Sequence, residues 1–222
     1  MFVPLRVDTE EMLDAVDAPR RETLRSLRDL RRFNRWMGGI AVYRRLLRAF
    51  GNPPPETILD LGTGTSDLLA SLRDGPIRRI GLDVKLEHLL YGRELGGAAV
   101  DRIVGDALHL PFRDGSVDLI TSAHFFHHFT PEQNVSLLDE SLRVSKRGVV
   151  VNDTRRHLVP LLVVRLLGML RLVGTITRFD APASVLRGFT TQEASDIARR
   201  TVASRSKVIR LWPYRFGLLL WK

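Results

Sequence analysis

The stretch TILDLGTGTSD, from Thr57 to Asp67, guides the interpretation of the rest of the chain. Its apolar start runs into the turn Gly62-Thr63-Gly64, and a segment of helical character begins at Asp67. This order predicts a buried strand, a tight glycine turn and a helix N-terminus. Glycine lets the backbone approach a ligand closely, and the free N–H groups that open a helix favour an anionic group. We therefore expect a nucleotide-like ligand at this turn.

Strand and helix patterns alternate after the proline-rich linker at 51–55. Such alternation predicts a parallel sheet with helices on both faces. The last two strand patterns are joined by a turn at Pro213 and predict an antiparallel hairpin. The fold class is therefore α/β: a Rossmann-like, seven-stranded, mostly parallel sheet with an antiparallel C-terminal hairpin. The predicted strands are 58–61, 79–83, 102–104, 117–122, 148–152, 207–212 and 214–221, and the helices between them are 67–73, 86–95, 131–144 and one that starts at 191.

The N-terminal region, 1–52, is expected to form a helical cap, followed by the main domain at 53–222. Thr9 is predicted to cap a first short helix and Pro19 to occupy the first turn of a second, which Gly38 and Gly39 end. This cap is interpreted either as a lid, with Asn34-Arg35-Trp36 folding over the ligand, or as a plain cover with a solvated basic face.

Composition limits the function classes. The 222 residues contain no cysteine, which excludes disulfides, cysteine-ligated zinc and a cysteine nucleophile. The net charge is +9, and arginine supplies 30 of the 34 basic residues. Such a charge is compatible with nucleic-acid binding, although a solvated basic face is the favoured interpretation. Neither a signal peptide nor a transmembrane helix is predicted, so the expected location is cytoplasmic.

Acidic residues follow successive predicted strands, at the sheet edge where α/β folds bind ligands. Asp60 lies in the first strand beside Gly62, and Asp83 ends the second, 21 residues after Gly62. That spacing suits a carboxylate that accepts hydrogen bonds from ribose hydroxyls. Asp106 follows the third strand and suits an adenine amine, and His124 follows the fourth.

The ordered motifs LDLGTGT, GLD, GDALHLPF and SVDLITSAHFFHHF resemble the class I S-adenosylmethionine-dependent methyltransferases. Within them, the chain is similar to the small-molecule branch that includes ubiquinone and menaquinone biosynthesis enzymes. The resemblance covers about residues 55–155 and the terminal hairpin. One departure is visible, because Ser66 stands at the third glycine of the usual motif.

The resemblance implies S-adenosylmethionine as the cofactor and assigns the residues that hold it. The methionine end would lie against Asp60 and the glycine turn, the ribose against Asp83, the adenine against Asp106, and the sulfonium beside the backbone at His124. The predicted cofactor set is Asp60, Gly62, Thr63, Gly64, Asp83, Val84, Asp106, Ala107 and His124.

Methyl transfer is an attack by a nucleophile on the methyl group of a sulfonium, so the protein mainly aligns two reactants. An oxygen acceptor also needs a base that works near neutral pH, for which histidine is suited. His124 and His128 are the first candidates, with Asp153 and His157 further ones; His127 is expected to pack structurally, and no metal is predicted.

An apolar block at 158–173 lies in the segment 155–190, which interrupts the alternation after the fifth predicted strand. We expect a helix with a break near Gly168 and then a loop with Pro182. Four interpretations stay open: a hydrophobic acceptor pocket, a dimer contact, a membrane-surface element and an ordinary buried helix.

The predicted function is methyl transfer to a small, hydrophobic or aromatic acceptor, with O-methylation favoured and C-methylation open. The alternatives are a tRNA or rRNA methyltransferase that uses the arginine-rich N-terminal face, and a non-catalytic cofactor-binding partner subunit. The missing cysteine and the absence of an Asn/Asp-Pro-Pro-Tyr motif after the fourth strand argue against base methylation.

Overall fold

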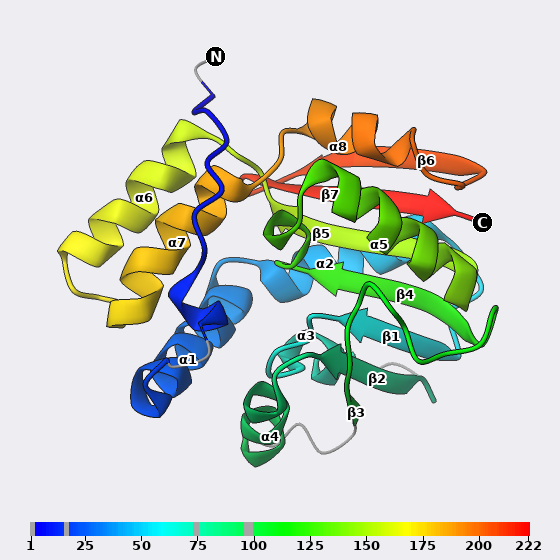
Figure 1. Cartoon of the computed structure of the whole chain (residues 1–222), viewed down its shortest axis with the longest axis horizontal. Coiled ribbons are helices and arrows are strands. Elements are labelled where there is room, and N and C mark those ends of the chain that lie inside the picture. Colours follow the sequence, from blue (N-terminus) through cyan, green and yellow to red (C-terminus); the bar gives the residue numbers. More distant parts are fainter. Residues whose placement is uncertain (1–2, 16–17, 73–75, 96–99) are drawn as a thin grey trace.

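The computed structural model describes residues 3–15, 18–72, 76–95 and 100–222. A seven-stranded sheet crosses the molecule in the order β3-β2-β1-β4-β5-β7-β6 (Figure 1). Its first four pairings are parallel, and β7 pairs antiparallel with both β5 and β6. The predicted fold class is confirmed. The strands are β1 (Thr57–Leu61), β2 (Arg78–Asp83), β3 (Asp101–Val104), β4 (Val117–Ala123), β5 (Ser145–Thr154), β6 (Arg205–Leu211) and β7 (Arg215–Trp221).

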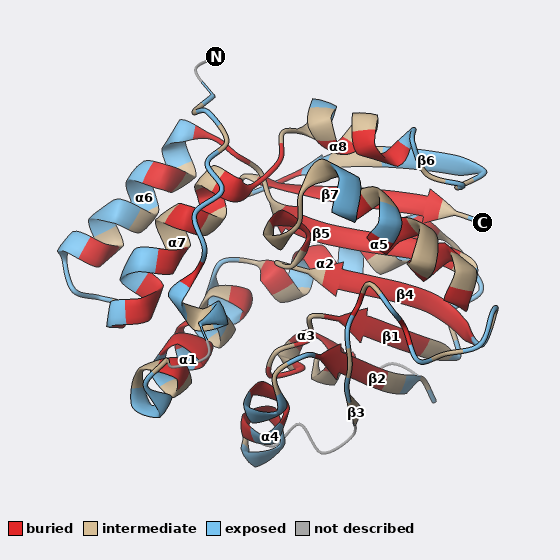
Figure 2. Cartoon of the chain, in the orientation of Figure 1, coloured by how far each residue is buried: buried red, intermediate tan, exposed pale blue. Residues whose placement is uncertain are grey.

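Helices cover both faces of this sheet because alternate residues of each strand point to opposite sides. In β5, Val149 and Val151 join the core under α5 and α8, whereas Val150 joins the core under α2 and α3. The central strands β1, β4 and β7 are almost wholly buried, whereas the edge strands β3 and β6 are largely exposed or half-buried (Figure 2). The helices are η1 (Met12–Asp14), α1 (Arg20–Trp36), α2 (Gly39–Phe50), α3 (Asp67–Ala70), α4 (Leu86–Glu94), η2 (Phe126–His128), α5 (Pro131–Val144), α6 (Leu158–Met169), α7 (Thr175–Arg187) and α8 (Thr191–Ala198).

The strand order reverses between β1 and β4. After β3 the chain returns to the other side of β1, so the carboxyl ends of β1 and β4 diverge into different loops. Open α/β sheets bind ligands at such a point. The helices α1, α6 and α7 stand beyond these carboxyl ends (Figure 1).

The N-terminal segment fastens this helical group to the sheet. The backbone N–H groups of Met12 and Leu13 donate to the two carboxylate oxygens of Asp180 on α7, at 2.8 and 2.9 Å. The Lys85 ammonium, just after β2, donates to the carbonyl of Leu13. Residues 3–15 therefore form a strap over the carboxyl ends of the strands, and we call them the N-terminal strap.

Element boundaries confirm several sequence predictions in detail. Helix α5 starts at Pro131 with a capping box between Thr130 and Gln133, as the pattern predicted. The prediction for 67–73 was too long, because α3 ends at Ala70; Arg73 itself lies outside the described residues.

Three local predictions were wrong. The expected loop around Pro182 is helical, since Pro182 lies inside α7. Proline disfavours a helix interior, but α7 buries Ile176, Ala183 and Val185, and this packing outweighs the lost N–H. Pro19 is the N-cap of α1 rather than a first-turn residue.

The third wrong prediction concerns the first short helix, which is the 3-10 turn η1 with Glu11, not Thr9, at its N-cap.

Within the described ranges, no helix has both the length and the apolar character needed to cross a bilayer.

Candidate functional site

A cavity of about 460 Å³ opens at the carboxyl ends of β1, β2 and β4, and we call it the strand-end cavity. Seven of the nine predicted cofactor residues line it. Asp60, at the end of β1, and Thr63, in the glycine turn itself, are the other two, and both are buried. The seven are Gly62, Gly64, Asp83, Val84, Asp106, Ala107 and His124.

The glycine turn needs backbone angles that favour glycine. Gly62 and Gly64 have φ values of 62° and 52°. A Cβ on Gly62 would lie 2.2 Å from the ring of Phe125, whereas a Cβ on Gly64 would meet no atom within 4 Å. Gly62 therefore lets the loop after β1 pack closely against Phe125 in the loop after β4, whereas Gly64 faces open space. Ser66 also adopts a left-handed φ of 57°, so it takes the backbone conformation that the missing third glycine would supply.

Two carboxylates mark the outer wall of the strand-end cavity. Asp83 is buried, and its oxygens accept hydrogen bonds from the backbone N–H groups of Gly64 (2.8 Å) and Lys85 (2.9 Å). A carboxylate has further lone pairs, so Asp83 can still accept from a ligand hydroxyl. Asp106 is exposed, and a hydrogen bond from His109 together with one from the Leu108 N–H lowers its pKa.

Asp60 is a buried acid at the base of the turn. Thr121 donates a hydrogen bond of 2.6 Å to it, and the Tyr43 hydroxyl lies 2.9 Å from that of Thr121. Burial raises the pKa of Asp60 to about 7 despite the Thr121 hydrogen bond. The ionised form would gain from a nearby cation, such as the ammonium group of a bound amino acid.

A second cavity, of about 150 Å³, lies between α1, α6, α7 and the end of β5, and we call it the apolar cavity. Helix α1 contributes Leu30, Phe33 and Met37, and the 155–190 segment contributes Pro160 and Val164. An engineered apolar cavity of about this volume binds benzene, so there is room for a small ring. The cap and the insertion after β5 thus supply most of this wall.

The two cavities share one boundary, which we call the seam. Its residues are Glu11, Leu13, Leu30, His124 and Ser184. A group held in either cavity therefore reaches the other only past these side chains. His124 is the sole member of the seam on a strand-end loop, and its φ of 54° turns its side chain out of the line of β4.

Both ring nitrogens of His124 have neighbours. Arg215 donates to Nε2, and Nδ1 lies 3.4 Å from the Thr154 hydroxyl. Burial, reinforced by the positive charge of Arg215, lowers the pKa of His124 to about 3. Arg215 is itself buried in the wall of the apolar cavity, and burial lowers its pKa to about 10, so it stays charged at neutral pH. The polar end of the apolar cavity is thus a neutral imidazole beside a buried cation.

His127 and Asp153 form a buried ion pair behind the seam. Asp153 Oδ1 lies 2.8 Å from His127 Nδ1, and Glu11 Oε1 lies 3.2 Å from His127 Nε2. Burial disfavours the charged imidazole, but the two carboxylates prevail and raise the pKa of His127 to about 10. Asp153 also accepts from the backbone N–H groups of His127 and Thr154, so its carboxylate is fully engaged.

His128 stands at the wall of the strand-end cavity. Its Nδ1 lies 2.8 Å from Asp14 and its Nε2 4.0 Å from Glu11. Glu11, His127 and His128 offer ligand atoms within 4.8 Å of one another, a spacing open to a metal ion as well as to the ion pairs that the structure contains. The N-terminal strap is therefore fastened to both histidines.

The other predicted residues fall in different places. His157 accepts from the Val159 N–H as the N-cap of α6. Asn34 lines the apolar cavity and donates to Asp67, whereas Arg35 and Trp36 face away from both cavities, on the far side of α1. Glu11 and Arg215 were not predicted from the sequence. Nothing in the local pattern of either residue marks it, because Glu11 reaches the seam, and Arg215 reaches His124, from a distant part of the chain.

Comparison with known proteins gives this fold and site their context. A family described as "Methyltransferase domain" matches residues 58–148. A demethylmenaquinone methyltransferase from Thermus thermophilus is 33% identical over 136 residues, which is 59% of this chain and 58% of the relative. One from Beutenbergia cavernae is 33% identical over 105 residues, 47% of this chain and 42% of the relative.

Among solved structures, human N-acetylserotonin methyltransferase in complex with S-adenosylmethionine aligns with a TM-score of 0.72. That alignment covers 97% of this chain and 60% of the human one at 17% identity, and so it shows the fold alone. The chain spans about half the length of the curated relatives it matches.

Residues 58–148 thus match a methyltransferase domain, and the chain has the fold of S-adenosylmethionine-dependent methyltransferases. In sequence the chain is similar to demethylmenaquinone methyltransferases.

Proposed function

We propose that this chain transfers the methyl group of S-adenosylmethionine to a small, hydrophobic acceptor that carries an acidic hydroxyl group, such as a phenol, a quinol or an enol. The observation that carries this proposal is the seam. It joins a cavity with the family's cofactor motif to a small apolar cavity with a buried cation.

The cofactor supplies the electrophile, so the chain's own residues orient and shield it. We assign the ribose to Asp83, the adenine to Asp106 with Ala107, and the methionine end to the glycine turn above Asp60. The sulfonium would then lie beside His124, facing the apolar cavity. Val84 completes this set as part of the cavity wall, and Thr63 supports the glycine turn.

Arg215 is the residue that selects the acceptor in this proposal. Its charge stabilises an oxyanion at the polar end of the apolar cavity, which lowers the pKa of an acceptor hydroxyl. That oxygen, or a carbon conjugated to it, attacks the methyl carbon while the carbon–sulfur bond breaks and its electron pair stays on sulfur. The displaced hydroxyl proton passes to His128 or directly to solvent, because His124 has a pKa of about 3 and its Nε2 already accepts from Arg215, so the predicted role of His124 as the base is not part of this proposal.

O-methylation is favoured over C-methylation because an oxygen beside Arg215 is the atom held closest to the seam.

We give Asp153 a positioning role, since it acts through His127. The cytoplasmic location remains a prediction from the sequence.

The test is a methyl-transfer screen with labelled S-adenosylmethionine and matched pairs of acceptors, each with and without the acidic hydroxyl. The proposal predicts label on the hydroxyl-bearing member of at least one pair. Binding of S-adenosylmethionine without transfer to any phenol, quinol or enol would instead support the non-catalytic partner subunit.

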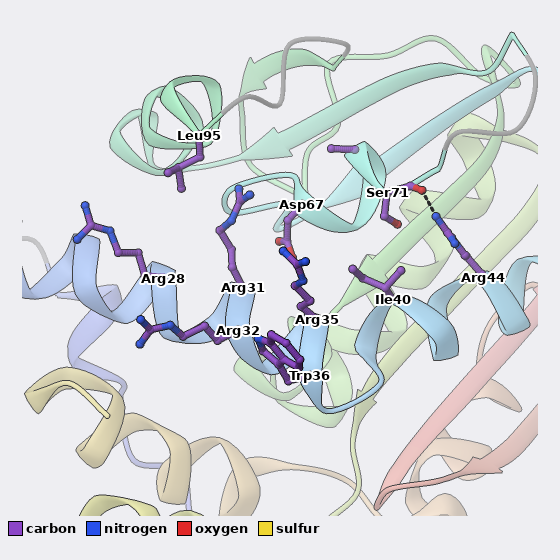
Figure 3. A pocket seen from close by; sticks show the side chains of 11 residues that line it. Arg28, Arg31, Arg32, Arg35, Trp36, Ile40, Arg44, Asp67, Ser71 and Leu95 are labelled. Carbon is purple, nitrogen blue, oxygen red and sulfur yellow. Dashed lines mark hydrogen bonds between the residues drawn. The ribbon is translucent and has the colours of Figure 1, made fainter. Parts of the chain in front are cut away.

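A second candidate function rests on a separate feature. A groove of about 920 Å³, the arginine groove, runs between α1 and α3 on the far side of α1 (Figure 3). It is lined by Arg28, Arg31, Arg32, Arg35, Arg44, Trp36 and Asp67, among others. Five guanidinium groups and an exposed tryptophan suit the phosphates and bases of RNA.

This groove shares no lining residue with the strand-end cavity, so RNA held there does not thereby present a base to the methyl group. A tRNA transcript provides the test. Tight binding that weakens steeply with salt, together with methyl transfer to the transcript, would favour the RNA function.

A further inference from the structure

The outer face of α6 is unusually apolar for a surface helix. Between Leu158 and Leu172, eight large apolar side chains are exposed, and Leu162 and Leu166 are each 54% exposed. This face lies at the edge of the molecule, away from the sheet (Figure 2). A contiguous exposed patch of this kind marks an interaction surface. The eight are Leu158, Val159, Leu162, Val163, Leu166, Met169, Leu170 and Leu172.

The charged side chains that α6 and the start of α7 expose are arginines, and the acids nearest to the turn between them, Glu22 and Asp29 of α1, accept hydrogen bonds from the backbone N–H groups of Thr175 and Gly174. Arg165, Arg171 and Arg178 are exposed, and the sequence from Arg155 to Phe179 contains no acidic residue. The next acid, Asp180, is buried and accepts hydrogen bonds from the N-terminal strap. The patch therefore combines apolar side chains with an excess of positive charge.

We propose that the outer face of α6 and the turn to α7 dock onto an anionic lipid surface. Helix α6 has 12 residues, about 18 Å, which is too short to span a bilayer but sufficient to lie in its interface. Apolar side chains enter the acyl boundary, and the arginines meet the anionic headgroups.

Charge complementarity favours lipid over a second copy of this chain. A symmetric dimer across this face would bring three arginines from each copy to one interface, and like charges at an interface are unfavourable. An anionic bilayer instead offers both an apolar interior and negative charge.

The inner face of the same helix connects this surface to the site. Pro160 and Val164 line the apolar cavity, as do Thr177 and Ala181 of α7. An acceptor dissolved in a bilayer would therefore lie one helix away from the cavity. This last step rests on the proposed function, whereas docking itself does not.

The experiment is co-sedimentation of the full chain with vesicles of phosphatidylcholine alone and of phosphatidylcholine with phosphatidylglycerol. We expect binding to the anionic vesicles that weakens with salt. The variant Leu162→Asp/Leu166→Asp should lose about tenfold or more in apparent affinity, since two leucines no longer enter the lipid. The variant Arg165→Gln/Arg171→Gln should lose about tenfold of the preference for anionic vesicles.

Val202→Asp is the matched control, because Val202 is 75% exposed and lies in the turn after α8. It should bind vesicles like the unmodified chain. All variants should keep their thermal unfolding temperature and their affinity for S-adenosylmethionine, which separates lost docking from lost folding or a failed site.

Two results would overturn the inference. One is equal binding by the Leu162→Asp/Leu166→Asp variant and the control. The other is a dimer in analytical ultracentrifugation that Leu162→Asp/Leu166→Asp dissociates, with no vesicle binding by the unmodified chain.

Discussion

The strand-end cavity and the apolar cavity meet at one seam but are built in different ways. The first takes about half of its lining from consecutive strand ends between Gly62 and His124, where hydrogen bonds such as that from the Gly64 N–H to Asp83 hold the backbone in place. The second is made from side chains of α1, α6, α7 and β7, which are far apart in the sequence. A backbone-built site tolerates little change, whereas a side-chain-built site can be altered one residue at a time. This explains how one cofactor site can serve many acceptors.

The largest loss of stability from a single substitution is expected at Gly62. In Gly62→Ala, the new Cβ would meet the Phe125 ring and the left-handed φ would be strained. We expect a loss of several kcal/mol in the free energy of unfolding, on the order of 3. Gly64→Ala, the matched variant, adds only the backbone strain, about 1 kcal/mol, because its Cβ points into open space.

Isothermal titration separates the two glycines further. That open space is where we place the cofactor. Gly64→Ala should therefore cost more binding free energy for S-adenosylmethionine than it costs free energy of unfolding. Equal unfolding free energies for the two variants would contradict the interlocking role of Gly62.

The next effect concerns the pH dependence of stability. Folding raises the pKa of Asp60 from 3.8 to about 7. The unfolded chain releases this proton at lower pH, so the ligand-free protein should lose stability as the pH rises from about 4 to about 7, and no more above that. The full loss from this group is on the order of 4 kcal/mol.

Urea unfolding of the ligand-free protein and of Asp60→Asn, at pH 5, 6, 7 and 8, checks this. Other groups titrate in both proteins, so the informative quantity is the difference between them. A difference that does not change between pH 5 and 7 would show that Asp60 is ionised in the folded state.

A substitution at Arg215 distinguishes the roles of the two cavities. Arg215→Met should lower kcat by about a hundredfold, since the acceptor oxyanion loses its cation. Affinity for S-adenosylmethionine should stay unchanged, because Arg215 lines only the apolar cavity. Single-turnover kinetics with the acceptor found in the screen measure the first, and calorimetry the second. Equal losses of turnover and cofactor affinity would refute this division.

The smallest effect is expected from the apolar wall. Phe33→Ala should raise KM for the acceptor by about tenfold and leave kcat nearly unchanged, because it removes uniform binding surface. Steady-state kinetics check it, with Trp36→Ala as the control, since Trp36 lies on α1 but outside both cavities. If Trp36→Ala raises KM and Phe33→Ala does not, the acceptor lies in the arginine groove.

The sequence predicted the backbone-built half well and the side-chain-built half poorly, for a physical reason. A glycine turn after a buried strand, and acids such as Asp83 and Asp106 at strand ends, are local patterns with fixed positions in an α/β sheet. Thus the predicted fold is confirmed, and seven of the predicted cofactor residues line one cavity, although their role in binding stays a prediction. By contrast, Glu11 reaches the seam and Arg215 reaches the apolar cavity through tertiary packing, and no local pattern encodes that.

Tertiary packing also decides which residues of the N-terminal region face the cavities. The N-terminal strap and Leu30 line both cavities, and Phe33 lines the apolar cavity. The predicted Arg35 and Trp36 lie on the opposite side of α1. Which face of a helix meets a ligand depends on the rotation of the helix, and α1 is arginine-rich along most of its length.

The central claim is that the methyl donor and the acceptor meet at the seam. A crystal structure with S-adenosylhomocysteine tests it most directly. The account predicts the ribose hydroxyls on Asp83 and the sulfur beside His124, facing the apolar cavity. A ligand in the arginine groove, or a sulfur turned away from the apolar cavity, would contradict it.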